Sequence, residues 1–344
     1  MSAGKKEVNK KNLFQRSIPL YLTILLVIFS GAIGYFLFPH PATQNTQVVA
    51  AKPDYSSEMD ILRNNDYQFT HPAYLYDVKG ENSKLTALKE RINEFISQNK
   101  SAKGIDNISV YFRDLNNGSW FEINGGVLYN PASLMKVPYL ICILKQAEIN
   151  PKFLDKQVYF DKHFDTGNNQ NIVDFKLKEN TNYTIKQLLT YMIANSDNDA
   201  TVLVAQNVNS EISEKLFSDL GLPATPKGAG EYFINVMDYC KFFRILYNGT
   251  YLSDRYSEFA LELLTKSTYK GGLLKDLNAD FPVSHKFGER IINQIQQLHE
   301  VGVFYQPDDP YLLGVMSSGH DLKELSSVLS QISQIVYQDH KKPS

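Results

Sequence analysis

Strand-like patterns stand at both ends of the patterned part of this chain, and a long helical stretch separates them. The first group contains a strong hairpin signal at Asn116-Asn117-Gly118. The two ends of the chain must come together if these strands are to form one sheet. We therefore predict an antiparallel sheet made from both chain ends, and one folding unit from about residue 67 to 340. The expected strands are residues 108–115, 120–123, 282–287, 298–305 and 311–316.

The stretch between the two groups of strands carries apolar residues at helical spacing. Further helices are expected over residues 85–96 and 321–337, outside that stretch. The order of elements predicts an α/β chain of the α+β kind, in which helices flank the sheet and a helical insertion divides it. The helical segments of the insertion are 134–148, 185–195, 198–207, 211–220, 236–247 and 257–265.

The N-terminal part of the chain has the composition of a membrane anchor. Residues 1–17 carry five basic residues and one acid, and residues 18–38 contain no charge. About 20 apolar residues suffice to span a bilayer, and basic residues before the span keep the N-terminus in the cytoplasm. The alternative is a cleaved signal peptide, whose apolar core would be about 7–15 residues long. We expect an uncleaved single-pass transmembrane helix, followed by an extracytoplasmic linker over residues 39–66.

The composition excludes several classes of protein. The chain has 344 residues, and 35 Lys and Arg stand against 37 Asp and Glu, so it has no basic excess for nucleic acid. Two cysteines, Cys142 and Cys240, are too few for a disulfide framework, and we expect both to be buried. Seven histidines show no paired metal-ligand spacing. We expect no metal, no cofactor and a monomer.

One S-x-x-K sequence has the setting of an activated nucleophile. Ser133 follows Asn130-Pro131-Ala132 and precedes an apolar helical run, whereas Ser97 and Ser267 begin the same pattern without that context. Backbone N–H groups and the dipole at a helix start can stabilise an oxyanion. Lys136 lies one turn further on, and a desolvated lysine can lose its proton and activate the hydroxyl. The alternative is an ordinary N-cap serine with a surface lysine.

Two further short sequences could complete such a site. Ser196-Asp197-Asn198 ends an apolar helical segment, where a hydroxyl and an amide could face a cleft. Ser196 could pass a proton to a leaving group, and Asn198 could hold a substrate carbonyl. Lys286 and Gly288 lie at the end of a predicted strand. The lysine could hold a carboxylate, and the glycine would let substrate pair with the strand backbone. Each sequence alone also fits a structural role.

The three sequences in this order resemble the S-x-x-K, S-D-N and K-T-G set of class A β-lactamases and penicillin-binding D,D-peptidases. The resemblance covers about residues 67–340. It implies the β-lactamase/transpeptidase-like fold, with an all-α subdomain at about residues 134–280 and the site between subdomain and sheet. It also implies a bacterial enzyme that forms an acyl-serine.

The resemblance also implies a role for each matching residue. Ser133 would be the nucleophile, Lys136 its base, and Ser196 the proton shuttle. Asn198 and Lys286 would bind substrate. The backbone N–H groups of Ser133 and Glu289, next to Gly288, would form the oxyanion hole.

Two departures from the family pattern bear on the activity. Phe287 stands where the family has the threonine of K-T-G, so a hydroxyl that binds the substrate carboxylate is missing. No E-x-x-L-N sequence occurs between residues 198 and 286, although class A β-lactamases take their deacylating glutamate from it. Glu231 is the one carboxylate in the short stretch that should supply it, and a solvated loop residue is its default role.

We therefore expect a serine hydrolase that acts on β-lactam or peptidoglycan stem-peptide amides outside a bacterial cell, with slow β-lactam deacylation. A D,D-carboxypeptidase or penicillin-binding role is the alternative within the family. A catalytically weak cell-wall sensor is a rival from another class. An esterase is a third possibility, because Phe287 could favour an apolar acyl group.

Overall fold

A computed structural model describes residues 59–340, except 65, 67, 69, 71, 79, 101–102, 165–175 and 224–230. The predicted basic segment 1–17, the predicted transmembrane helix 18–38 and most of the predicted linker lie outside the described residues. No helix within the described part is long and apolar enough to cross a membrane.

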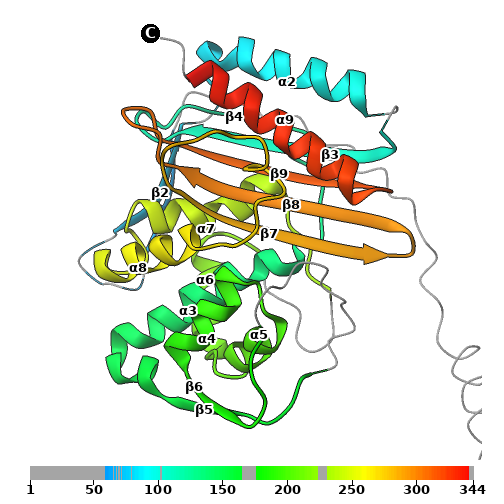
Figure 1. The fold of residues 1–344 in the computed structure, drawn as a ribbon. Coiled ribbons are helices and arrows are strands. Elements are labelled where there is room, and N and C mark those ends of the chain that lie inside the picture. Colours follow the sequence, from blue (N-terminus) through cyan, green and yellow to red (C-terminus); the bar gives the residue numbers. More distant parts are fainter. Residues whose placement is uncertain are drawn as a thin grey trace, which may run out of the picture. The chain divides into compact units, whose positions relative to one another are not determined.

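Five antiparallel strands form the main sheet, and they come from both ends of the chain, as predicted (Figure 1). Their order in the sheet is β4-β3-β9-β8-β7, so the N-terminal hairpin joins the C-terminal strands where β3 pairs with β9. Strand β7 lies at one edge of the sheet. The bounds are β3 Ile105–Asp114, β4 Trp120–Ile123, β7 Val283–Ile292, β8 Ile295–Phe304 and β9 Tyr311–Gly319.

Helices cover both faces of this sheet (Figure 1). Helices α2 (Thr86–Asn99) and α9 (Leu322–His340) pack on one face, while α7 (Val236–Tyr247) and α8 (Asp254–Thr265) pack on the other. The apolar residues of α9 recur every three or four positions, which puts them on one side of the helix. The side that they form faces the sheet, and the buried ones are Leu325, Val328, Leu329, Ile332 and Val336.

The remaining helices form the predicted insertion, with two corrections. They are α3 Lys136–Ile149, α4 Ile185–Ala194, α5 Asn198–Ala205 and α6 Ser210–Asp219. The segments predicted at 236–247 and 257–265 pack on the main sheet as α7 and α8, so they do not belong to a helical unit separate from it. The insertion is not all-α, because β5 (Gln157–Phe160) pairs with β6 (Thr181–Thr184) in a two-stranded sheet. Each strand has four residues. A periodicity argument needs longer runs than this, so these strands carry no usable sequence signal.

A further correction concerns the start of the domain. Met59–Arg63 forms strand β1 inside the segment predicted to be a linker, and it pairs with β2 (Ala73–Val78). The boundary predicted near residue 67 is therefore too late. Asp77 of β2 accepts a 2.7 Å bond from Arg113 and a 2.9 Å bond from Arg244. These ion pairs join the hairpin to β3 and α7, and such long-range pairing is invisible in a local pattern.

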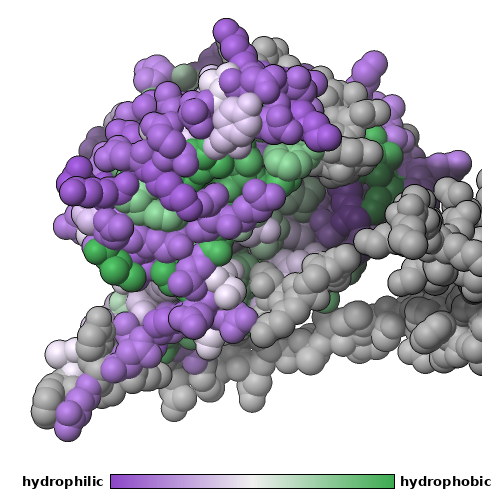
Figure 2. All heavy atoms as spheres, turned by 90° about the horizontal axis from the view of Figure 1, so that it is seen from below, coloured by the Kyte–Doolittle hydropathy of each residue, from purple (hydrophilic) through white to green (hydrophobic). Residues whose placement is uncertain are grey.

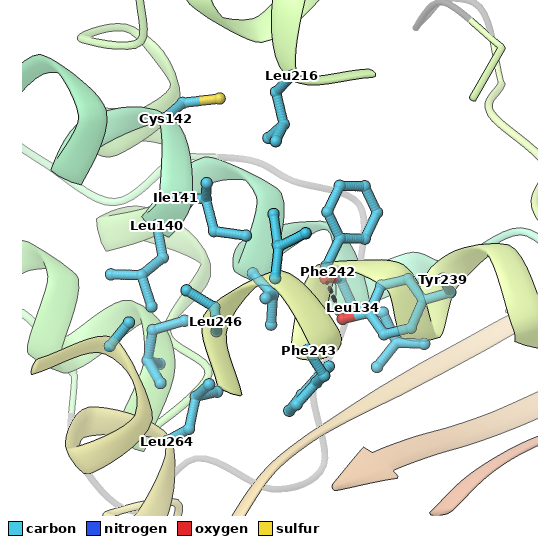
Figure 3. Packing of buried hydrophobic residues seen from close by; sticks show 14 of the residues in the cluster. Leu134, Leu140, Ile141, Cys142, Leu216, Tyr239, Phe242, Phe243, Leu246 and Leu264 are labelled. Atoms are coloured by element: carbon cyan, nitrogen blue, oxygen red, sulfur yellow. Dashed lines mark hydrogen bonds between the residues drawn. The ribbon is translucent and has the colours of Figure 1, made fainter. Parts of the chain in front are cut away.

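A large apolar cluster joins the helical insertion to the sheet (Figure 3). Helices α3 and α7 contribute most of the labelled side chains, and Leu134 lies among them. Cys142 and Cys240 are both free and buried, as predicted. The face that Figure 2 shows is mainly hydrophilic, with hydrophobic residues exposed in smaller areas. Because Leu134 belongs to the apolar cluster, the core lies directly behind the turn that carries Ser133.

Candidate active site

Ser133 lies in a short 3-10 helix, η2 (Ala132–Met135), that leads directly into α3. Ala132 has φ +49°, a left-handed conformation that is strained for a residue with a side chain. The Asn130 side chain accepts a 3.0 Å bond from the Ala132 N–H, and the Tyr239 hydroxyl donates to Leu134 O at 2.8 Å. These contacts hold the turn in place. Backbone strain of this kind is found at functional sites.

Lys136 begins α3 and is almost fully buried. Its Nζ donates to three acceptors: Ser196 O at 2.5 Å, Ser196 Oγ at 2.9 Å and Asn198 Oδ1 at 3.0 Å. The structure therefore brings the second predicted sequence against the first, across 60 residues of chain. Asn198 was predicted to hold a substrate carbonyl, and its side-chain oxygen accepts from Lys136.

The turn that carries Ser196 is fixed by its neighbours. Helix α4 ends at Ala194, and Ser196 has φ +56°, which reverses the chain. Asp197 then caps α5, because its side chain accepts a 2.7 Å bond from Ala200 N. Capping of this kind typically contributes about 1 kcal/mol to helix stability. The Ser196 hydroxyl is thereby held in a buried position between two elements.

Lys286 approaches the same hydroxyl from β7. Its Nζ donates to Ser196 Oγ at 3.0 Å and to Phe287 O at 2.9 Å, and the residue is fully buried. Ser196 Oγ thus lies between two lysine amines. A hydroxyl in this position can receive a proton from one group and pass one to another.

Burial shifts the pKa of both lysines downward. It lowers the pKa of Lys136 to about 7, and the nearby Asp197 carboxylate opposes the shift. Burial also holds the pKa of Lys286 well below its usual value, the charge of Lys136 lowers it further, and Glu300 opposes. Desolvation disfavours the charged form of an amine. A substantial fraction of Lys136 is therefore neutral near pH 7 and can accept a proton.

Gly288 lets β7 come close to the Ser133 turn. A Cβ at this position would lie 2.6 Å from Pro131 O and 3.2 Å from Leu134 N, so a larger residue would force the two backbones apart. The close approach places the backbone of Gly288 and Glu289 beside η2. The two segments whose N–H groups were predicted to form an oxyanion hole are therefore neighbours.

An aromatic pair covers the predicted carboxylate anchor. The Phe287 ring stacks on Tyr269 with centroids 3.9 Å apart, and Lys286 Nζ lies 4.1 Å from the Phe287 centroid. The Lys286 amine therefore lies against the Phe287 ring, which itself packs on Tyr269. Sequence reasoning identified Phe287 but missed Tyr269, because no pattern shows that the loop after α8 returns to β7.

The Glu231 carboxylate forms an ion pair with a side chain of β7. The partner is Arg290, whose guanidinium donates to the carboxylate. The Glu231 side chain is 49% exposed, so an ion-paired surface carboxylate stands in the stretch that should supply the family's deacylating glutamate.

His299 contacts the segment just before Ser133, and it was not identified from the sequence. It is fully buried, and burial lowers its pKa to about 4, so it is neutral near pH 7. Ser317 N–H donates to its Nδ1 at 3.2 Å, so Nε2 carries the hydrogen and faces Asn130 O at 3.1 Å. A lone histidine in a strand gives no sequence signal for this role.

Comparison with known proteins identifies the family. The family model described as the Beta-lactamase enzyme family matches residues 87–340, which is most of the chain. The chain belongs to this family. The predicted superfamily and the predicted enzyme class, a serine hydrolase, are therefore confirmed. No curated protein matches the chain.

Solved structures of this β-lactamase-like fold are similar to the chain at low identity. A beta-lactamase from Chitinophaga pinensis has a TM-score of 0.63 and 19% identity, covering 74% of this chain and 100% of its own. An acyl-enzyme complex of a PBP-A mutant with penicillin G has a TM-score of 0.62 and 20% identity, covering 75% and 98%. A class A beta-lactamase from Mycobacterium abscessus has a TM-score of 0.61 and 16% identity, covering 73% and 100%. At these identities the likeness shows the fold.

Proposed function

We propose that this protein is a membrane-anchored enzyme that forms an acyl-serine at Ser133 with β-lactams or D-alanyl amides and releases β-lactam products slowly. The observation that carries the proposal is the Ser196 hydroxyl held between the Lys136 and Lys286 amines, 2.9 and 3.0 Å away, beside the Ser133 turn. A pure binding protein does not need two buried amines, both with a lowered pKa, on one hydroxyl. This argues against the cell-wall sensor.

The proposed reaction follows from these positions. Neutral Lys136 accepts the Ser133 proton while Oγ attacks the substrate carbonyl. The N–H groups of Ser133 and Glu289 stabilise the oxyanion. The bond from carbonyl carbon to nitrogen then breaks, and Ser196 delivers a proton to the leaving nitrogen. Lys136 returns the proton to Ser196.

Two observations favour a D,D-peptidase-like role over that of a fast β-lactamase. The sequence lacks the E-x-x-L-N glutamate, and Glu231 is paired with Arg290. Deacylation of a β-lactam ester needs a base that holds water against it, and no such base is identified in the described part of the chain. The stem peptides of peptidoglycan are then the natural substrates, and a β-lactam is a substrate analogue that remains bound.

An esterase is the second candidate, and one contact favours it. Phe287 and Tyr269 place an aromatic stack against Lys286, where the family has a carboxylate-binding hydroxyl. An apolar acyl group would pack on such a stack better than a carboxylate. Hydrolysis of a neutral ester faster than acylation by a penicillin would favour this alternative.

The proposed location rests on residues 18–38 and on the basic segment before them. In intact bacterial cells that express the full-length chain, a fluorescent penicillin that does not cross the cytoplasmic membrane should label the protein. The labelled band should remain with the membranes after a high-salt wash. A soluble labelled protein would remove the anchor from the proposal, and an unlabelled protein would contradict the acyl-serine itself.

The rate of acylation should depend on pH through Lys136. Its active form is the neutral amine, and its pKa is lowered to about 7 by burial. The rate constant for labelling should therefore rise about tenfold per pH unit below pH 7 and level off above it. Measurement between pH 5.5 and 8.5, with thermal unfolding checked at each pH, tests this. A flat profile would show that Lys136 is not the proton acceptor.

A further inference from the structure

A cavity of about 310 Å³ lies at the N-terminal ends of α4 and α8, away from the lysines of the active site. Lys186 belongs to the first turn of α4, and Arg255 and Tyr256 belong to the first turn of α8. A volume of this size accommodates a small ligand such as a single sugar ring. The proposed reaction uses none of these residues.

The charge around the cavity is positive, although the whole chain has a formal charge of −2. Lys152, Lys186 and Arg255 line it, against the single acid Asp155. Within the described part of the chain, none of the three cations forms an ion pair with a carboxylate. Glu262, one turn beyond the cavity on α8, is bonded to Lys266 at 2.7 Å, and Lys186 acts on it only through space, without a salt bridge. The three cations are therefore available to an external anion.

Two aromatic rings lie next to these cations. Lys186 Nζ lies 5.6 Å from the ring centroid of Phe259, and the Arg255 guanidinium lies 5.9 Å from that of Tyr256. Both rings are partly buried and line the cavity. A ligand ring can stack on an aromatic face while an acidic substituent meets the adjacent cations. This combination selects a ring that carries a negative charge.

The helix ends place the cavity in the fold, because both α4 and α8 begin at it. The α4 end is closed by the Thr184–Gln187 capping box, and the first turn of α8 carries Asp254, so the lining side chains rather than the helix ends supply the positive charge. The other ends of α4 and α8 meet where Thr268 N donates to Ala194 O at 2.9 Å. A ten-residue helix such as α4 is about 15 Å long, so the cavity is distinct from the acylation site.

We propose that this cavity is a second binding site, which takes an anionic sugar: a ring that carries a carboxylate or a phosphate. The aromatic rings hold the sugar, and Lys152, Lys186 and Arg255 hold its acidic group. This proposal does not depend on the chemistry at Ser133.

Saturation-transfer NMR on the full-length protein in detergent tests the proposal with glucuronate, glucose 6-phosphate and neutral glucose as probes. Saturable binding of at least one acidic sugar is expected, and glucose should bind at least tenfold more weakly. The double variant Lys186→Gln/Arg255→Gln should bind the acidic sugar at least tenfold more weakly, because its hydrogen bonds to charged groups are lost. The matched control is Lys323→Gln, an exposed lysine on α9, which should change nothing.

The relative affinity of the two acidic sugars distinguishes a carboxylate from a phosphate ligand. If the double variant does not fold, as judged by circular dichroism, Lys152→Gln provides the same test. Equal binding of glucose, or an unchanged affinity in the folded variants, would overturn the proposal. Penicillin labelling of the variants is measured in parallel and should be unchanged, so failure at Ser133 and failure at this cavity are distinguishable.

Discussion

Replacing Ser133 with alanine is expected to abolish covalent labelling by a fluorescent penicillin. The hydroxyl at this position is the atom that would bond to the substrate carbonyl carbon, and no neighbouring group named in the site can replace it. Ser196 also carries a hydroxyl in the site, but its Oγ is held by two lysine amines at 2.9 and 3.0 Å. The measurement is gel fluorescence, with the adduct mass determined on the intact protein.

Two other serines provide matched controls, because each also begins an S-x-x-K sequence. Ser97 lies on the exposed side of α2 and donates to Asn93 O, and Ser267 lies in the loop after α8. Ser97→Ala and Ser267→Ala should be labelled like the unaltered protein. Labelling that survives in Ser133→Ala would assign the nucleophile elsewhere.

The lysine beside the nucleophile should matter nearly as much. Lys136→Ala removes the proton acceptor, and general-base contributions are typically about 10²–10⁴-fold, so acylation should slow by that factor. The same change removes the partner of Ser196 and Asn198. The buried Lys136 side chain also contributes to packing, so its loss could unfold the protein. Thermal unfolding of the variant must therefore show that it is folded before the rate is interpreted.

The main sheet could be predicted because its strands are short apolar runs bounded by turn residues. Strand β9, for example, is buried at every position, so it shows a continuous run rather than alternation. The hairpin at Asn116-Asn117-Gly118 is one example of such a turn, since Gly118 has φ +76° and its N–H donates to Asp114 O at 2.9 Å. The hairpin β1–β2 was missed for the opposite reason. Its contacts with the rest of the domain include the bonds of Asp77 to two distant arginines, which no local pattern shows.

The site was predictable in its composition but not in its geometry. Short sequences placed Ser133, Lys136, Ser196 and Lys286 in one set, and the structure brings the two lysines to the Ser196 hydroxyl. Tyr269 and its stacking on Phe287 could not be predicted, because they depend on the course of a loop. The positive φ of Ala132 and Ser196 likewise gave no sequence signal, because neither residue is a glycine. The catalytic roles remain predictions that the variants above test.

The largest consequence of the departures from the family pattern should appear in the second half of the reaction. After acylation, a fast β-lactamase holds water against the ester with a glutamate. Here Glu231 is paired with Arg290, and no E-x-x-L-N sequence occurs between residues 198 and 286. Loss of a positioned base costs about 10²–10⁴ in rate, so the acyl-enzyme should persist for minutes or longer. Intact-protein mass spectrometry with benzylpenicillin, followed over hours, measures its lifetime.

Acylation and release can be separated by one variant. Phe287→Thr restores a hydroxyl next to Lys286 and removes the ring that stacks on Tyr269. A hydrogen bond to a charged group contributes about 1.5–3 kcal/mol, so capture of the β-lactam carboxylate and the acylation rate should improve by about tenfold or more. Release should stay slow, because a threonine hydroxyl supplies no base for water.

Steady-state hydrolysis of a chromogenic cephalosporin decides between the two family roles. If release is limiting, turnover must lie far below about 10 s⁻¹, the median for enzymes generally. The variant Arg290→Gln provides a further control, because it frees the Glu231 carboxylate from its cation. Faster release in this variant would show that Glu231 can reach the ester. Turnover above about 10 s⁻¹ in the unaltered protein would mean that another group activates the water, and the assignment to slow, D,D-peptidase-like chemistry would then be wrong.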